Sequence, residues 1–117
     1  MAINSRRKGA SGEREAAKWL NDNIGGSARR GVQYSGSPDS PDVVFDEAIQ
    51  LEIKRVERIN IDTALEQAKR DGIGKIPVVM HRRNNKPWQF TLYAENLVDF
   101  CRRIVEIKSE HSQKKDS

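Results

Sequence analysis

Hydrophobic residues recur at helical spacing near both ends of the chain and at strand spacing between them. The first helical stretch predicts a helix that begins near Ser11, a good N-cap residue, and ends at Gly25. Glu13 and Glu15 would then lie in its first turn, where the helix dipole favours acids. The apolar face of this helix would be formed by Ala16, Ala17, Leu20 and Ile24.

The middle of the chain carries short β-rich runs separated by turn residues. We expect strands at 28–34, 42–46, 49–56, 76–81 and 88–93, with helices at 62–71 and 94–108. A tight turn at Glu47 and Ala48 would make the second and third strands a hairpin. The order α, β, β, β, α, β, β, α predicts an α/β fold, a single domain with a central mixed sheet of about five strands flanked by helices.

The two ends of the chain lack this hydrophobic pattern. Residues 1–10 are polar and basic, and we expect a flexible basic arm there. Residues 109–117 have nothing to bury and are expected to be a disordered tail. The domain itself would therefore span residues 11–108.

Charge and cysteine content narrow the class of protein. The 117 residues include 21 Lys and Arg against 17 Asp and Glu, a net charge of +4. That excess points toward a polyanion such as nucleic acid, although a merely basic surface remains the alternative. Cys101 is the only cysteine, which excludes an internal disulfide, and we expect it in the core. With no secretory signal and no membrane-spanning apolar run, a cytoplasmic protein is expected.

The strand expected at 49–56 carries the first candidate chemistry. Side chains alternate along a strand, so Glu52 and Lys54 share one face while Leu51 and Ile53 point into the core. An isolated acid and lysine in this arrangement usually form a solvated surface.

Asp42 changes this interpretation. It follows Pro41, and the hairpin would bring it close to Glu52. Two neighbouring carboxylates repel each other unless a cation lies between them, and oxygen ligands favour Mg²⁺ over zinc. Asp42 as a simple turn residue remains the alternative.

Two further residues extend the candidate site. Glu13 shares a face with the apolar residues of the first helix, so it is either a first-turn dipole partner or an additional ligand. Gln67, on the helix after the two strands, either contacts the same region or lies on the surface. His81 and His111 have no metal-ligand spacing and are read as structural or exposed.

The ordered set Glu13 … Pro41-Asp42 … Glu52-Ile53-Lys54 resembles the PD-(D/E)xK nuclease superfamily. More closely, the chain resembles the archaeal-type Holliday junction resolvases, which also occur in some phages. The similarity rests on residues 7–15 (RKGASGERE), on Arg30 with the Ser35-Gly36-Ser37 loop, and on the runs 76–79 and 88–90. It extends from about Arg6 to Tyr93.

This resemblance implies a restriction-endonuclease-like fold and a magnesium-dependent endodeoxyribonuclease that resolves four-way DNA junctions as a homodimer, in a prokaryotic or phage setting. Mg²⁺, with Mn²⁺ as a substitute, would be held by Asp42, Glu52 and the backbone carbonyl of Ile53. Lys54 would orient the attacking water, and Glu13 would add an outer contact or a second-metal ligand. The longer link from Pro38 to Pro41 departs from the family and makes Asp39 a rival to Asp42.

DNA binding would need cations outside the metal site. No base-reading element is evident, so recognition of DNA shape is expected. The candidates for DNA contact are Arg6, Arg7, Lys8, Arg14, Arg29, Arg30, Ser35, Ser37 and Arg55. Two other functions stay open: another small nuclease of the same superfamily (a nickase, flap or repair nuclease), and a non-catalytic DNA-binding adaptor.

Overall fold

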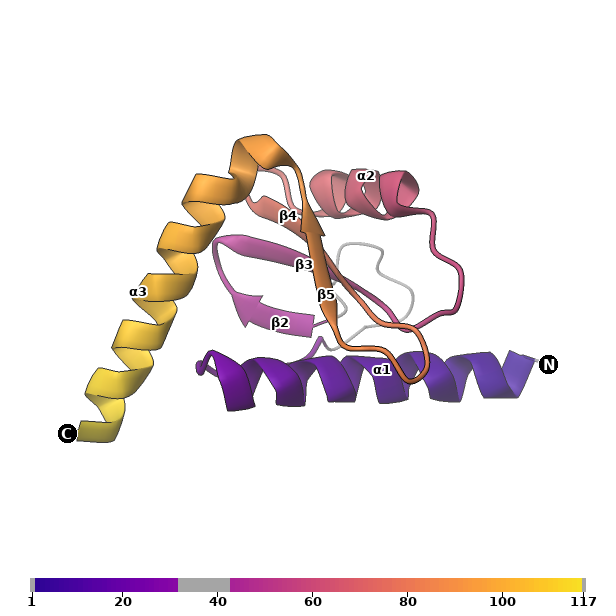
Figure 1. The fold of residues 1–117 in the computed structure, drawn as a ribbon, viewed down its shortest axis with the longest axis horizontal. Helices are drawn as coiled ribbons and strands as arrows, with labels where there is room; N and C mark the ends of the chain where they lie inside the picture. The colour runs from indigo at the N-terminus through magenta and orange to yellow at the C-terminus, as the bar shows by residue number, and fades with distance from the viewer. Residues whose placement is uncertain (1, 32–42, 117) are drawn as a thin grey trace.

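A computed structural model describes residues 2–31 and 43–116, with side chains placed for residues 11–31 and 43–112 (Figure 1). The expected order of helices and strands is confirmed, with one short 3₁₀ helix, η1, added before the last helix. The elements are α1 (Ala2–Asn23), β1 (Arg29–Arg30), β2 (Val43–Asp46), β3 (Ile49–Lys54), α2 (Ile61–Asp71), β4 (Ile76–His81), β5 (Gln89–Leu92), η1 (Ala94–Asn96) and α3 (Leu97–Asp116).

The strands form one mixed sheet of five strands in the order β1-β2-β3-β4-β5, as expected. The hairpin of β2 and β3 is antiparallel, and β4 pairs with β5 in the same way. β3 and β4 run parallel because α2 carries the chain back between them, and their register pairs Glu52 with Val79 and Lys54 with His81.

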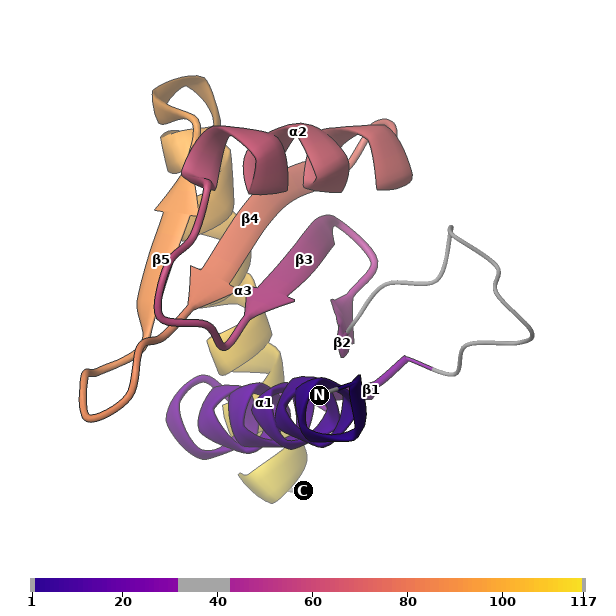
Figure 2. The same ribbon diagram turned by 90° about the vertical axis from the view of Figure 1, so that its right-hand side faces the viewer.

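Helices cover both faces of the sheet (Figure 2). α1 and part of α3 lie against one face and bury Leu20, Leu51 and Met80 in the larger core. α2 lies on the other face, where Ala64 and Leu65 pack on Val79. β3 is therefore covered from both sides, and its first five residues are all buried.

The first helix begins at Ala2, so the expected start near Ser11 is wrong. Residues 2–10, expected to be a flexible basic arm, have a helical backbone and belong to α1. Gly12 instead lies inside α1, where a Cβ atom would stand 2.5 Å from Cβ of Arg55. The glycine allows α1 to approach the end of β3 closely, and the sequence gives no sign of that contact.

The last helix runs to Asp116 instead of ending at Lys108, which corrects the disordered tail expected at 109–117. Its final turns have a partner after all, since His111 packs against Gly25 at the end of α1. Cys101 is exposed on α3, so its expected place in the core is also wrong. No helix within the described residues is long and apolar enough to cross a membrane.

Candidate active site on β3

Glu52 and Lys54 form an ion pair near the end of the central strand β3. Lys54 Nζ lies 3.2 Å from Glu52 Oε1, and the two side chains are 34% and 6% exposed. The alternation that places both on one face, with Leu51 and Ile53 in the core of the opposite face, is confirmed. Glu52 does not, however, belong to a solvated surface. Burying a carboxylate is costly unless a cation or hydrogen bonds compensate it, so this position is unusual for a purely structural acid.

The packing of α2 explains why Glu52 is buried. Its register partner Val79 is fully buried beneath Ala64 and Leu65 of α2. Lys54 lies one pleat further along, where the strand ends and the cover of α2 becomes incomplete. The ammonium group therefore reaches solvent while the carboxylate stays inside.

Asp42, Asp39 and the serines at 35 and 37 lie outside the described residues. The nearest described residue is Val43, which opens β2 and pairs with Leu51, the residue before Glu52. The hairpin on which the pairing of Asp42 with Glu52 was predicted is therefore present. The position of Asp42 itself stays a prediction.

Glu13 lies on α1 opposite the short strand β1. Its Oε2 atom accepts a hydrogen bond of 2.8 Å from Nε of Arg30, and the two side chains are 20% and 42% exposed. Because α1 begins at Ala2, Glu13 is not in its first turn, and the dipole interpretation is wrong. The structure thus brings two of the predicted residues, Glu13 and Arg30, together as an ion pair.

The fit of a magnesium ion rests on the oxygen donors available. Glu52 provides a buried carboxylate, which suits a hard cation. Among the side chains that the structure describes, no group of three or more His, Cys, Asp or Glu lies close enough together to hold a metal ion. A complete ligand set with Glu52 therefore depends on Asp42.

Glu15, expected in the first turn of the helix, instead joins three parts of the fold. It forms ion pairs with Arg82 at the end of β4 and, at 3.4 Å, with Nε of Arg55 just after β3. Arg55 also donates a hydrogen bond of 2.8 Å to Oδ1 of Asn84 and is only 15% exposed. Although Arg55 was predicted to contact DNA, its guanidinium group is engaged within the protein.

His81 lies beside Lys54, since the two are register partners in the parallel pair. Its Nε2 atom is 2.8 Å from the hydroxyl of Thr91 on β5. Burial lowers the pKa of His81 below its ordinary value, so the imidazole is neutral at pH 7 and adds no charge beside the ammonium group.

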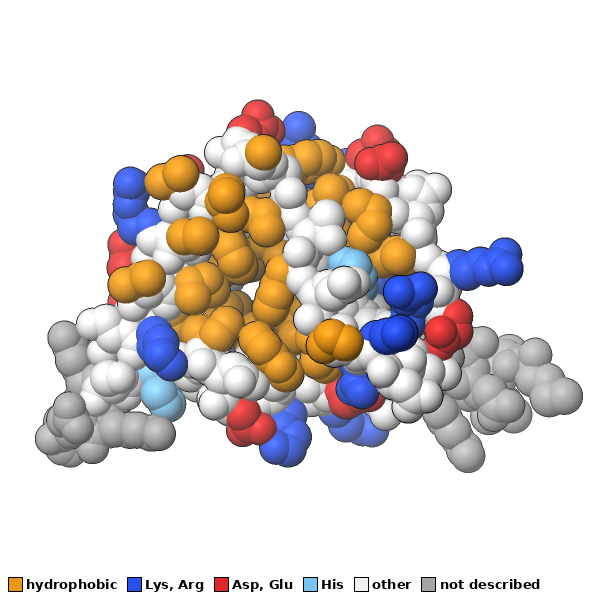
Figure 3. Space-filling view, viewed as in Figure 1, with side chains coloured by type: hydrophobic (Ala, Val, Ile, Leu, Met, Phe, Trp, Pro, Cys, Tyr) orange, Lys and Arg blue, Asp and Glu red, His pale blue; other side chains and the backbone are white. Residues whose placement is uncertain are grey.

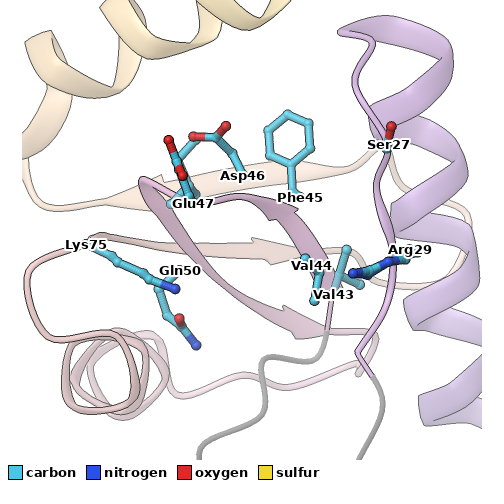
Figure 4. Close-up of a pocket in the computed structure, with 10 residues that line it drawn as sticks. Ser27, Arg29, Val43, Val44, Phe45, Asp46, Glu47, Gln50 and Lys75 are labelled. Carbon is cyan, nitrogen blue, oxygen red and sulfur yellow. The ribbon is translucent and has the colours of Figure 1, made fainter.

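Of the other predicted DNA contacts, Arg14 and Arg29 are exposed. Arg29 lines a cavity of about 440 Å³ along β2, which also contains Asp46 and Lys75. In Figure 4 Arg29 lies on the Val43 side of this cavity, and Gln50 and Lys75 lie on the other side. The side chains of Arg6, Arg7 and Lys8 lie outside the described set, although their backbone belongs to α1.

A second cavity, of about 260 Å³, opens beside Lys54. Gln67 of α2 is half-buried and lines this cavity together with Lys54. Arg58, from the loop before α2, also lines this cavity, and sequence reasoning missed it. A signal was present, because Arg58 follows the Glu52–Lys54 strand closely in the chain.

No protein-family model, curated protein or solved structure matches this chain. What the protein does is therefore inferred from its own residues and from their arrangement.

Proposed function

We propose that this protein is a divalent-metal-dependent endodeoxyribonuclease that cleaves four-way DNA junctions. The observation that carries the proposal is the ion pair of Lys54 with the buried carboxylate of Glu52, which lies beside an open cavity at the end of β3. The positive net charge of +4 and the exposed Arg14 and Arg29 support a polyanionic substrate. The sequence resemblance to junction resolvases supports the choice of branched DNA.

The reaction would be hydrolysis of a phosphodiester. A water oxygen forms a bond to phosphorus, one P–O ester bond breaks, and the leaving oxygen takes up a proton. Glu52, together with Asp42, would provide the carboxylates that hold Mg²⁺. When bound, the ion would place positive charge beside a phosphate oxygen and lower the pKa of a water molecule. Lys54 would donate hydrogen bonds to the attacking water and to the charge that develops on the phosphate.

The same site would serve another small nuclease, such as a nickase or flap nuclease. The geometry around Lys54 does not distinguish these substrates, because DNA shape is read by surfaces outside the ion pair. A DNA-binding adaptor is the remaining alternative. A buried carboxylate paired with a lysine counts against it, since an adaptor gains nothing from the cost of burying Glu52.

The test compares cleavage of a four-way junction, linear duplex, a flap and single-stranded DNA in Mg²⁺. The variants are Asp42→Asn, Glu52→Gln and Lys54→Ala, with Glu66→Gln as the matched control because Glu66 is exposed on α2. Symmetric cuts in the junction alone, lost in the three variants and kept in the control, would support the proposal.

Other outcomes would replace it. Cleavage of flaps or nicking of duplex, lost in the same variants, would keep the chemistry and change the substrate. Binding of DNA without cleavage by the unmodified protein would leave the adaptor. Full cleavage by Glu52→Gln would overturn the assigned site.

We further propose that the protein acts as a homodimer, because cutting two opposed strands calls for two symmetry-related sites. We place this activity in the cytoplasm. An exposed apolar strip on α3 supports self-association. Leu97, Val98 and Val105 are 50%, 66% and 67% exposed and share one side of the helix with Cys101. Figure 3 shows hydrophobic side chains gathered over β5 and α3.

A further inference from the structure

We propose that the cavity beside Lys54 binds a second phosphate group of the DNA backbone, next to the phosphate that is cleaved. This inference rests on the proposed nuclease function and adds a binding site to it. The cavity, of about 260 Å³, lies between the end of β3, the loop that follows it, and α2. Its lining residues are Lys54, Val56, Arg58, Ile59, Asn60, Thr63, Ala64 and Gln67.

The chemistry of the lining favours an anion. Lys54 and Arg58 supply two positive charges, and none of the described residues that line the cavity is acidic. Among the side chains of residues 11–31 and 43–112, Arg58 has no ion-pair partner. Its guanidinium group is therefore available for phosphate oxygens, for which the planar fork of arginine is well suited.

Neutral donors complete the lining. Oδ1 of Asn60 accepts a hydrogen bond of 3.1 Å from the backbone N–H of Thr63, so the amide nitrogen of Asn60 remains a donor. The hydroxyl of Thr63 and the amide of Gln67 are two more. Cations together with neutral donors are the groups that contact DNA phosphates in protein–DNA complexes.

The position of the cavity distinguishes this phosphate from the cleaved one. Glu52, which would hold the metal ion, does not line the cavity, whereas Lys54 belongs to both places. A phosphate in the cavity would therefore contact Lys54, whereas Glu52 is not among the residues around it. The cleaved phosphate must contact the metal ion, so the cavity would hold a neighbouring phosphate of the same strand.

The first experiment measures binding to a four-way junction without cleavage, in Ca²⁺, as a function of salt. Arg58→Gln should bind about tenfold or more weakly at low salt, and its slope of log K against log salt should fall by about 0.9 for one lost phosphate contact. Arg70→Gln is the matched control, because Arg70 is an exposed arginine on α2, the helix that follows Arg58, and does not line the cavity. Equal slopes for the two variants would overturn the proposal.

A second experiment locates the phosphate. Single phosphates near the cut are replaced by neutral methylphosphonates, and binding is measured with the unmodified protein and with Arg58→Gln. We expect one position, adjacent to the cleaved phosphate, where the substitution weakens binding by the unmodified protein and leaves Arg58→Gln unaffected. Thr63→Val should lose part of the same effect. If every position weakens both proteins equally, the cavity does not hold a DNA phosphate.

A third measurement does not require nuclease activity. Inorganic phosphate is titrated into the protein while the side-chain amide signals of Asn60 and Gln67 are followed by NMR. Shifts that saturate, and that are lost in Arg58→Gln, would support a phosphate site even if the protein cuts no DNA. Failure of the proposed nuclease function can therefore be distinguished from failure of the phosphate site. Saturation without any methylphosphonate effect would assign the cavity to a free phosphate and overturn the DNA assignment. No shift and no methylphosphonate effect would overturn both.

Discussion

Arg103 of α3 donates two hydrogen bonds of 2.8 Å to the carboxylate of Asp46 at the end of β2, from Nε to Oδ2 and from a terminal nitrogen to Oδ1. The side chain of Asp46 is only 10% exposed, and Oδ2 also accepts a hydrogen bond from the backbone N–H of Ala48. This pair joins the last helix to the hairpin that carries Glu52. Both side chains of this ion pair are largely shielded from solvent, whereas the partners of most surface ion pairs are exposed.

Asp46→Asn should therefore lower the free energy of unfolding by about 1–3 kcal/mol, since a hydrogen-bonded carboxylate is replaced by a neutral amide. Asp99→Asn is the matched control. Asp99 lies 3.8 Å from Arg102, with both side chains 67% exposed, and its loss should cost less than about 1 kcal/mol. Urea denaturation of both variants at pH 7 measures the difference. Equal costs would mean that the Asp46 contact adds nothing to stability.

The same pair should make stability depend on pH. Hydrogen bonding by Arg103 holds the pKa of Asp46 below its ordinary value in the folded protein. The unfolded chain therefore binds a proton first as pH falls, and the stabilisation by the pair is complete above the unfolded pKa of about 3.9 and is lost below it. The difference in unfolding free energy between the natural protein and Asp46→Asn should be constant from pH 7 to pH 5 and shrink toward pH 3. A constant difference at pH 3 would contradict this linkage.

The sequence predicted the sheet well because its strands carry strong local signals. The hairpin turn at Glu47 and Ala48, and the alternation around Glu52, follow from residues close in the chain. Contacts between distant residues were not predictable in this way. Gly12 against Arg55, and His111 against Gly25, bring together parts of the chain that share no local pattern. The mispredicted start of α1 and end of α3 both lie at these contacts between distant parts of the chain.

The candidate site divides along the same line. Strand alternation predicted that Glu52 and Lys54 share one face of the sheet. The order of elements along the chain offered Gln67, on the next helix, as a neighbour of that face. The partners of Glu13 and Glu15 did not, because spacing on a helix shows which face a residue occupies and does not identify the arginine opposite. The two glutamates consequently differ in a way that the sequence alone could not reveal.

Glu13→Gln and Glu15→Gln should therefore separate activity from stability. Glu15 compensates Arg55, whose buried Nε atom has no hydrogen-bond partner among the described residues, so Glu15→Gln should cost about 1–2 kcal/mol of unfolding free energy. Glu13 pairs with a more exposed arginine, and its loss should cost less than about 1 kcal/mol. Because Glu13 is a proposed outer ligand of the metal ion, Glu13→Gln should instead reduce the rate of junction cleavage at least about tenfold. Thermal unfolding and cleavage rates of both variants test this, and a reversed pattern would remove Glu13 from the site.

The junction between α1 and α3 can be tested at two glycines. Gly25 and Gly74 both have positive φ, of 105° and 83°, so alanine is strained at either position. A Cβ at Gly25 would also lie 2.5 Å from the ring of His111, whereas at Gly74 it would meet nothing within 4 Å. Gly25→Ala should therefore cost about 1–3 kcal/mol more than Gly74→Ala, the usual penalty for overpacking. Adding His111→Ala should recover that excess; without recovery, the ring contact is not its cause.

The exposed strip on α3 gives the last prediction, which concerns the proposed homodimer. Val98 and Val105 are 66% and 67% exposed. A glutamate at either position would place a negative charge in an apolar interface. Sedimentation should show a dimer for the natural protein and a monomer for Val98→Glu or Val105→Glu. Val56→Glu is the matched control, because Val56 is a 39% exposed valine on the loop after β3 and does not belong to α3, so it should leave the dimer intact.

A second readout of the same interface uses Cys101, the only cysteine of the chain and exposed on α3. One spin label attached there gives one label per chain, so any dipolar coupling must arise between two copies. Coupling should appear at the concentrations at which sedimentation shows a dimer and disappear in Val105→Glu. A natural protein that stays monomeric at every concentration, or a dimer unaffected by either valine substitution, would show that this strip is not where two copies meet.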